Sequence, residues 1–388
     1  MAGESRLQVD LVQDAGQLEC LKEAWNGLVE KNETRTVELT YEWEMTYWKH
    51  FHQDARLFVL LARRNGSVVG IAPLKLTQKS ILGLKIRILE FIASRESNYQ
   101  DFLLGEGQTE VLQAFWEFLE TEKGSWDVVR LAYVPDGSPT VDFITKGEGS
   151  PFPHRVDKIY RCLSLNVDRP WDAYFQGLTR SVRRDIARCQ RVLGRMGPLR
   201  YYRCGSVEDC REQLEVLFEQ HRQRWNATDT PSQFNGPCAR EFYLDTVAQL
   251  PPRDQVQLWV LAVGDKPIAL CYTFVYDGVL LPQIATYDRA YTAGSPTAVL
   301  DYFMMKEAFD NGIKAIDMGD YFDYKMKWAP QNRQKLAIEL YSPRPLPRAL
   351  CALISAQAPI REKARRIPGV SGMVRRVRKA LNEPSSDG

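Results

Sequence analysis

Polar and ionisable residues gather where apolar segments of this chain end. Tyr287 and Asp288 follow one such segment, Asp317 lies at the end of a later one, and Tyr324 and Lys325 come soon after. A carboxylate at a strand end can accept a proton, directly or through water, and a tyrosine hydroxyl can donate one. We therefore take Asp317, Asp288 and Tyr324 as candidate catalytic residues, and Lys325 as a contact for an anionic substrate or a developing oxyanion. The alternative is structural: Asp317 caps a turn, Tyr324 and Trp328 close the core, and Lys325 is solvated.

A loop of small residues precedes a helical pattern that runs to Phe309 and stops at Asn311-Gly312. The free N–H groups and the positive dipole end of such a helix can hold an anion such as a pyrophosphate, and small residues let it approach the backbone. Proline suits the first turn because no N–H donor is needed there. The candidate cofactor-binding residues are Gly294, Ser295, Pro296, Thr297 and Ala298. An ordinary strand-to-helix turn is the alternative.

The elements around this loop follow a regular order. Three β-rich segments separated by short turns predict an antiparallel meander over 258–263, 268–276 and 279–287. The loop and helix come next, and 313–318 predicts one more strand. The meander therefore ends at Tyr287, directly before the loop.

The same order occurs earlier in the chain. An Asn65-Gly66 turn joins two apolar segments, and a helix and a strand follow over 111–119 and 126–133. The chain therefore predicts an α/β fold of two duplicated halves, each a mixed, mostly antiparallel sheet flanked by helices. Glu106 and Glu110 flank the helix start in the first copy and disfavour phosphate there, so we assign donor binding to the second copy. The predicted division is 1–150, 151–343 and a basic amphipathic tail, 344–388.

Segment 178–196 predicts a helix with one basic and one apolar face. Its arginines follow one another at steps of three or four residues: Arg180, Arg184, Arg188, Arg191 and Arg195. A solvated helix face is the ordinary explanation. Aligned arginines also repel one another unless an anion lies nearby, so a phosphate-bearing donor, a carrier protein or RNA is the alternative.

The bulk composition fits a globular chain of 388 residues with 44% hydrophobic content. No run of about 18 apolar residues and no leader pattern is seen, so we expect a cytoplasmic protein. The eight cysteines show neither metal-ligand nor disulfide spacing, so we expect no metal and reduced thiols. The tail has ten basic residues and one acidic residue between Arg344 and Lys379. It suits peripheral contact through 345–388 with an anionic membrane surface or an acidic carrier protein, or a disordered solubilising tail.

The order of the elements, with segments 295–300, 317–319 and 324–328, resembles the GNAT acyltransferase superfamily. It is most similar to the branch with two GNAT-like halves, which includes the Fem-type peptidoglycan aminoacyltransferases and the cellulose-biosynthesis-type acetyltransferases. The resemblance extends from Leu18 to Trp328. It implies acyl-CoA or an acyl carrier protein as donor and a backbone N–H within 282–287 that polarises the thioester carbonyl. Thr297 stands where the branch often has glycine.

The resemblance also implies residues that contact the acceptor. His221 and Trp225 match a His-x-x-x-Trp pair that lines the acceptor site in related proteins. Tyr99 and Asp101 belong to a short motif that lies, in the branch, in the cleft between the halves. The candidate substrate-binding set also includes Tyr287, Lys325 and Trp328. A structural histidine and a loop with internally satisfied hydrogen bonds are the alternatives.

Together these features predict a bacterial-type N-acyltransferase that transfers an acyl group from a CoA or carrier-protein thioester to the amine of a small molecule, a sugar or an amino acid. The first alternative is a Fem-type enzyme that takes an aminoacyl group from charged tRNA. The regularly spaced arginines of segment 178–196 favour this alternative. The second is a non-catalytic binding protein with a GNAT fold, which Thr297 favours.

Overall fold

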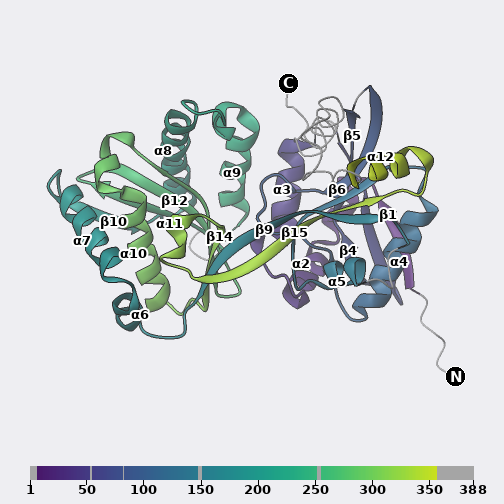
Figure 1. Cartoon of the computed structure of the whole chain (residues 1–388), viewed down its shortest axis with the longest axis horizontal. Helices are drawn as coiled ribbons and strands as arrows, with labels where there is room; N and C mark the ends of the chain where they lie inside the picture. The colour runs from purple at the N-terminus through teal and green to yellow at the C-terminus, as the bar shows by residue number, and fades with distance from the viewer. Residues whose placement is uncertain (1–6, 53–54, 82, 147–150, 251–254, 356–388) are drawn as a thin grey trace, which may run out of the picture. The chain divides into compact units, whose positions relative to one another are not determined.

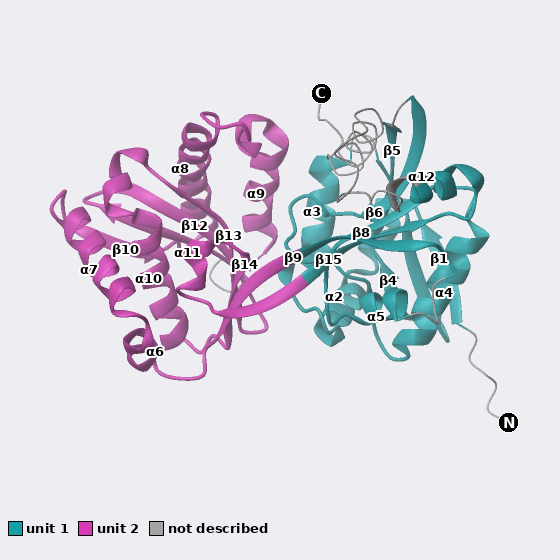
Figure 2. Cartoon of the chain, viewed as in Figure 1, with its two compact units in different colours: residues 1–159, 335–388 teal, residues 160–334 magenta. Residues whose placement is uncertain are grey.

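The computed structural model describes residues 7–52, 55–81, 83–146, 151–250 and 255–355 (Figure 1). The chain forms two compact units, unit 1 (Met1–Ile159 and Lys335–Gly388) and unit 2 (Tyr160–Gln334), coloured separately in Figure 2. The sequence placed its boundaries at 150 and 343. The structure instead divides within strands β9 (His154–Asn166) and β15 (Gln331–Tyr341), because Lys335–Tyr341 pairs with a strand of unit 1. Of the predicted tail, Arg344 donates to the carbonyl oxygen of Trp126, 345–355 forms helix α12 (Pro345–Ser355), and 356–388 lies outside the described residues.

Unit 1 contains two sheets, with strand orders β1-β3-β4-β7 and β15-β8-β6-β5-β2. β1 lies at the edge of the first sheet. The elements besides β9, β15 and α12 are β1 (Leu7–Val12), α1 (Ala15–Glu19), α2 (Lys22–Lys31), η1 (Val37–Leu39), α3 (Tyr41–Phe51), β2 (Ala55–Leu57), β3 (Val59–Arg64), β4 (Ser67–Ala72), β5 (Leu74–Ile81), β6 (Leu84–Phe91), β7 (Leu103–Leu104), α4 (Gln108–Thr121), β8 (Val128–Pro135) and α5 (Pro139–Thr145).

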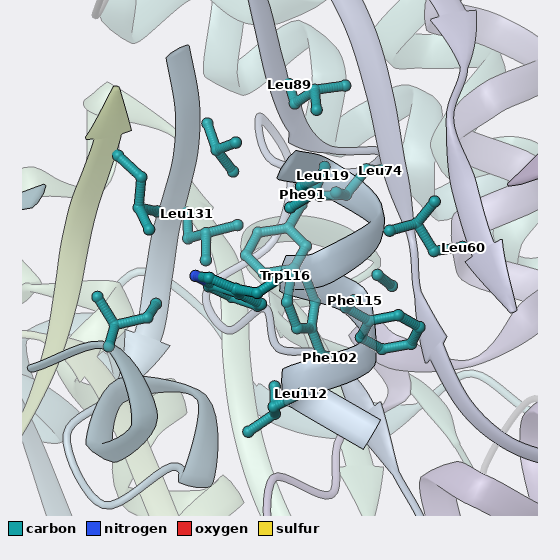
Figure 3. Packing of buried hydrophobic residues seen from close by; sticks show 14 of the residues in the cluster. Leu60, Leu74, Leu89, Phe91, Phe102, Leu112, Phe115, Trp116, Leu119 and Leu131 are labelled. Carbon is teal, nitrogen blue, oxygen red and sulfur yellow. The ribbon is translucent and has the colours of Figure 1, made fainter. Parts of the chain in front are cut away.

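The core of unit 1 forms around the apolar face of α4 (Figure 3). Phe102 lies in the middle of this core, with its ring centroid 5.7 Å from those of Phe91 and Phe115 and 5.8 Å from that of Trp116. Edge-to-face contacts of this kind add to the gain from burying the rings. α4 sits close to the first sheet because β4 has a glycine where the helix crosses it. A Cβ atom at Gly70 would lie 2.3 Å from Cγ1 of Val111.

Unit 2 has one sheet in the order β10-β11-β12-β13-β14-β9. The predicted meander is confirmed as β11, β12 and β13, which pair antiparallel in sequence order. The elements are α6 (Trp171–Gly177), α7 (Arg180–Gly194), β10 (Leu199–Arg203), α8 (Val207–Trp225), η2 (Gln233–Asn235), α9 (Pro237–Gln249), β11 (Val256–Val263), β12 (Lys266–Tyr276), β13 (Val279–Tyr287), η3 (Arg289–Gly294), α10 (Pro296–Asp310), β14 (Ala315–Asp320) and α11 (Asp323–Met326).

Helices cover both faces of this sheet, which explains why all eight residues of β11 are buried. On one face, Trp259 and Cys271 share a core with Met304 of α10. On the other face, the ring of Tyr272 packs 5.2 Å from that of Tyr243 in α9. Because successive strand residues point to opposite faces, Cys271 and Tyr272 mark the two sides.

The two units repeat one folding pattern. The β3–β4 hairpin has one extra residue, Val69, at a bulge, and the β11–β12 hairpin has Ile268 at the corresponding place. In unit 1, the connection from β6 to the parallel strand β8 contains β7 and α4, and in unit 2 the connection from β13 to the parallel strand β14 contains η3 and α10. The fold is therefore a mixed α/β fold with duplicated halves. Among the described residues, no helix is both long enough and apolar enough to cross a membrane.

Candidate functional site

Helix α10 begins at the loop that the sequence predicted, with Pro296 in its first turn. Ser295 is the N-cap residue in the left-handed region (φ 43°, ψ 61°), and its carbonyl oxygen accepts from the N–H groups of Ala298 (3.0 Å) and Val299 (3.3 Å). The Ser295 side chain makes no capping hydrogen bond, and no acidic residue lies in the first turn. The positive end of the helix, including the predicted Thr297, therefore has no anionic side chain of its own turn to compensate it.

Gly294 is small for a reason other than ligand approach. It is buried directly under α7, and a Cβ atom there would lie 2.3 Å from Cδ2 and 2.5 Å from Cγ of Leu193. Two atoms cannot approach this closely, so the glycine lets α7 pack against the segment that precedes α10.

Strands β13 and β14 pair only at their beginnings. Val279 pairs with Ala315 and Leu280 with Ile316, and β14 then continues beside β9. Within the described pairing, β14 pairs with no residue of β13 beyond Leu280, and an extended ligand can add to a strand edge of this kind. β13 also has an extra residue, Gln283, at a bulge opposite Tyr272 and Thr273.

Three ionisable side chains of α10 and α11 interact electrostatically. The pKa of the Asp301 carboxyl is raised to about 7 because burial disfavours its charge, although Lys325 and Lys327 oppose this. Lys325 Nζ donates to the carbonyl oxygens of Met318 (2.5 Å) and Asp320 (3.2 Å), and burial lowers its pKa. Burial and the nearby Asp301 raise the pKa of Tyr324. This arrangement combines a carboxyl group that titrates near neutral pH, a proton-bearing phenol and a fixed cation.

Next to these residues, Arg224 of α8 stacks between two aromatic rings. Its guanidinium carbon lies 5.2 Å from the ring centroid of Trp225 and 5.0 Å from that of Tyr287. Arg224 also interacts electrostatically with Tyr324 and His221. The structure therefore brings four predicted residues, His221, Trp225, Tyr287 and Tyr324, together around one arginine.

His221 is held as a neutral base. Its ring stacks on Trp225 with a centroid separation of 5.7 Å, and Nδ1 lies 2.8 Å from the Ser232 hydroxyl oxygen. Burial first, and then the charge of Arg224, lower its pKa to about 4. The imidazole is therefore uncharged at neutral pH and can exchange hydrogen bonds with a polar substrate.

Three other predicted residues have structural contacts. Asp317 is buried and accepts from the N–H of Gly319 (2.8 Å). Asp288 caps η3 through the N–H of Ala290 (2.9 Å) and pairs with Lys266 (2.7 Å), which holds its pKa low although burial opposes this. Trp328 is fully buried in the core of unit 2, and its carbonyl oxygen accepts from the Tyr174 hydroxyl. These contacts favour the structural alternative for all three.

Tyr99 and Asp101, the two predicted residues of unit 1, lie in a loop whose position is fixed by hydrogen bonds to buried carboxylates. Glu38 accepts from the N–H groups of Asn98 (2.6 Å) and Tyr99 (3.0 Å), and burial raises its pKa to about 7. The Tyr99 ring faces the ammonium group of Lys335 at 5.2 Å. Asp101 is buried and accepts from Thr34, Thr140 and its neighbour Phe102, so its role is to fix the loop.

Asp301 is not among the residues predicted from the sequence. A signal was present, because it is the only acidic residue in the apolar stretch from Pro296 to Met305. Glu44 and Lys75, which are buried in unit 1, were not predicted from the sequence either. Their burial depends on strands that are distant in sequence.

Comparison with known proteins agrees with this geometry. Residues 180–326 match the family model described as an acetyltransferase (GNAT) domain. A crystal structure of FemX superposes with a TM-score of 0.61 at 11% identity, over 88% of this chain and all of that one. The structure of L-PGS from Bacillus licheniformis superposes with a TM-score of 0.51 at 13% identity, over 88% of this chain and 97% of that one.

The C-terminal domain of a putative lysylphosphatidylglycerol synthetase from Agrobacterium fabrum gives a TM-score of 0.52 at 11% identity, over 84% of this chain and 93% of that one. No curated protein matches the chain in sequence. At these identities the superpositions show a shared fold. Residues 180–326 are therefore similar to a GNAT acetyltransferase domain, and the chain shares its fold with FemX.

Proposed function

We propose that this protein is an N-acyltransferase that transfers an acyl group from the thioester of CoA or of an acyl carrier protein to an amine. The observation that carries the proposal is the open edge of β13 beside the uncompensated N-terminus of α10. The phosphopantetheine arm shared by both donors has amide groups that can pair with a free strand edge, and its phosphate end suits a helix N-terminus.

The residues of unit 2 can carry out the proton transfers of this reaction. Attack on a thioester needs an unprotonated amine, and a pKa of about 7 suits Asp301 to accept the amine proton at neutral pH. Tyr324 retains its proton because its pKa is raised, so it can protonate the departing thiolate. The ammonium group of Lys325, held by two carbonyl oxygens, favours the ionised form of Asp301.

Acceptor recognition falls to the residues around Arg224. Its guanidinium group lies over the two rings, and such a group suits a planar anionic partner such as a carboxylate. His221, neutral and bonded through Nδ1, adds an uncharged polar contact. We infer an acceptor that carries an amine and an anionic or polar group, of which an amino acid is the simplest example.

The first test is thioester turnover in the absence of RNA. Purified protein is incubated with acetyl-, octanoyl- or palmitoyl-CoA and a panel of amines, and free thiol and acylated amine are both measured. Amine-dependent thiol release supports the proposal. Turnover or thermal stabilisation with charged tRNA alone would favour aminoacyl transfer, and no effect of any donor would favour a non-catalytic binding protein.

The second test concerns the donor site. Thr297→Asp places a negative charge in the first turn of α10, where it stabilises the helix but repels a phosphate. We expect donor affinity to fall about tenfold or more without loss of thermal stability. The matched control is Thr109→Asp, in the first turn of the duplicated helix α4. Equal donor affinity in both variants would place the phosphate elsewhere.

A further inference from the structure

The outer face of α7 has a row of exposed arginines without sufficient counter-charge. Arg180, Arg184, Arg188, Arg191 and Arg195 are all exposed, whereas the opposite face of the helix is buried through Val182, Ile186, Cys189 and Leu193. We call these five side chains the arginine row. At 1.5 Å per residue it extends over about 22 Å.

Contacts within the described chain neutralise little of this charge. Arg188 lies 3.9 Å from the exposed Asp185, and Arg191 donates to a carbonyl oxygen of its own helix, that of Ala187 (3.2 Å). The first turn of α7 contains no acidic residue, although it begins with Arg180 and is followed by Arg184. Cations at the positive end of a helix oppose folding, so the row is poorly suited to stability alone.

The row belongs to the helix that packs on the donor loop. Leu193, on the buried face of α7, covers Gly294, the last residue before Ser295 and the start of α10. A partner held by the arginine row therefore lies across α7, one helix diameter (~10 Å) from the loop that begins α10, where the proposed function places the phosphate of the donor.

The length of the row argues against free CoA as its ligand. CoA has a pyrophosphate and one further phosphate, and α10 already offers a site for one of these groups. Five arginines at three- and four-residue steps instead match carboxylates repeated at the same steps along another helix. The exposed Met196 (52% exposed) at the end of the row suits a protein surface. The exposed positions of α7 include no aromatic side chain on which a nucleobase could stack.

We propose that the arginine row docks an acidic helix of a carrier protein that presents the acyl thioester on its phosphopantetheine arm. This inference rests on the proposed N-acyltransferase function and names the form of its donor. Docking orients the arm so that its phosphate reaches α10 and its amides reach the open edge of β13. Acyl transfer then breaks the thioester C–S bond and forms the C–N bond, and the thiol remains on the carrier protein.

The test compares two donors of the same acyl chain, octanoyl acyl carrier protein and octanoyl-CoA, with the full-length chain. The variant is Arg184→Gln/Arg188→Gln/Arg191→Gln, whose side chains are exposed and whose folding is checked by thermal unfolding. The control removes three exposed positive charges from unit 1, Lys31→Gln/Lys85→Gln/Lys123→Gln. We expect the ratio of kcat/KM for the carrier donor to kcat/KM for the CoA donor to fall about tenfold or more in the arginine variant and to be unchanged in the control.

Direct binding gives the second readout. Affinity for holo acyl carrier protein, measured by fluorescence anisotropy, should decrease between 50 and 300 mM salt, decrease in the arginine variant, and recover in part when the same three positions are lysine. An unchanged donor ratio in the arginine variant would overturn the inference and leave the proposed function intact. No turnover of either thioester would overturn both. If the protein binds charged tRNA but not the carrier protein, and the arginine variant weakens this binding, the arginine row would be assigned to RNA.

Discussion

Leu193 of α7 lies directly over Gly294, so closely that a single added carbon at position 294 would come within 2.3 Å of the leucine side chain. Leu193 is fully buried, so it has no free space into which to move. This contact joins the helix with the arginine row to the loop that begins α10. The position of α7 therefore depends on the absence of a side chain at position 294.

Gly294→Ala should therefore destabilise unit 2 by about 1–3 kcal/mol, because overpacking moves side chains from their preferred rotamers. The measurement is urea unfolding followed by tryptophan fluorescence. Gly194→Ala is the matched control, since a Cβ atom at Gly194 meets nothing within 4 Å. The pair Leu193→Ala/Gly294→Ala should lose less stability than the two single changes predict, and simple additivity would show that the residues do not compete for space.

Asp301→Asn should lower kcat by about 10²- to 10⁴-fold if Asp301 accepts the amine proton. In the unmodified protein, kcat/KM should rise with pH through about 7 as Asp301 loses its proton, and this step should be absent from the variant. The readout is amine-dependent thiol release between pH 5.5 and 9. Asp310→Asn, at the exposed end of the same helix, is the control. Retention of the step in Asp301→Asn would assign it to another group.

Arg224→Met should raise the pKa of His221 from about 4 toward its usual value of about 6.5, because the arginine charge is one of the two causes of the shift. NMR titration of the ring protons can follow this, since the chain has only four histidines. Arg211→Met, at the start of the same helix, should leave it unchanged. Because the pKa of His221 is lower in the folded state than in the unfolded state, the stability that its neutral form contributes is lost as pH falls from about 6.5 through 4. A titration near 6.5 in the unmodified protein would contradict its burial.

Glu44→Gln should reduce the loss of stability that unit 1 undergoes as pH rises. Burial raises the pKa of Glu44 to about 8, so the folded state holds this proton and the unfolded state releases it above about 4.5. Stability contributed by the protonated form is therefore present at low pH and lost between about pH 4.5 and 8. Two buried oxygens, Glu44 Oε1 and Gln100 Oε1, accept no hydrogen bond in the described structure. Burying both without a donor would be costly if Glu44 were ionised, which favours the protonated carboxyl group.

The measurement for Glu44→Gln is thermal unfolding at pH 5, 6, 7 and 8. Glu42→Gln, on the same helix, is the opposite case, because Asn26 and Lys22 hold the Glu42 pKa low against the effect of burial. The stability that ionised Glu42 contributes is therefore present at neutral pH and lost as pH falls. A Glu44→Gln profile that still declines from pH 5 to 8 as steeply as the unmodified protein would mean that Glu44 is ionised when folded.

Much of the fold could be predicted because its signals are local. The Asn65-Gly66 turn, the meander and the start of α10 at Pro296 depend on residues that are adjacent in sequence. The boundary between the units could not be predicted in this way. It falls inside β9 and β15, and only the pairing of Lys335–Tyr341 with β8 shows that this part of β15 belongs to unit 1.

The candidate site was predictable in composition rather than in detail. His221, Trp225, Tyr287 and Tyr324 could be named from the sequence, but the arginine that joins them could not be given its role, because stacking needs two rings from different elements. Asp317 and Asp288 were chosen because they end strands. Their own backbone contacts, with Gly319 and Ala290, engage them in turns, whereas the raised pKa of Asp301 arises from burial that only the folded sheet provides.

The pairing of Lys335–Tyr341 with β8 also sets the order of events on the ribosome. Unit 2 is one continuous segment, whereas unit 1 is encoded by both ends of the chain. The strand that completes the larger sheet of unit 1 is synthesised about 200 residues after β8, which at 5–20 residues per second means a delay of roughly 10–40 s. Throughout that interval the nascent chain exposes an unpaired β8 edge of the kind that aggregates. Unit 1 is thus begun first and finished last, and a chain truncated before residue 335 releases a unit 1 whose sheet stays open.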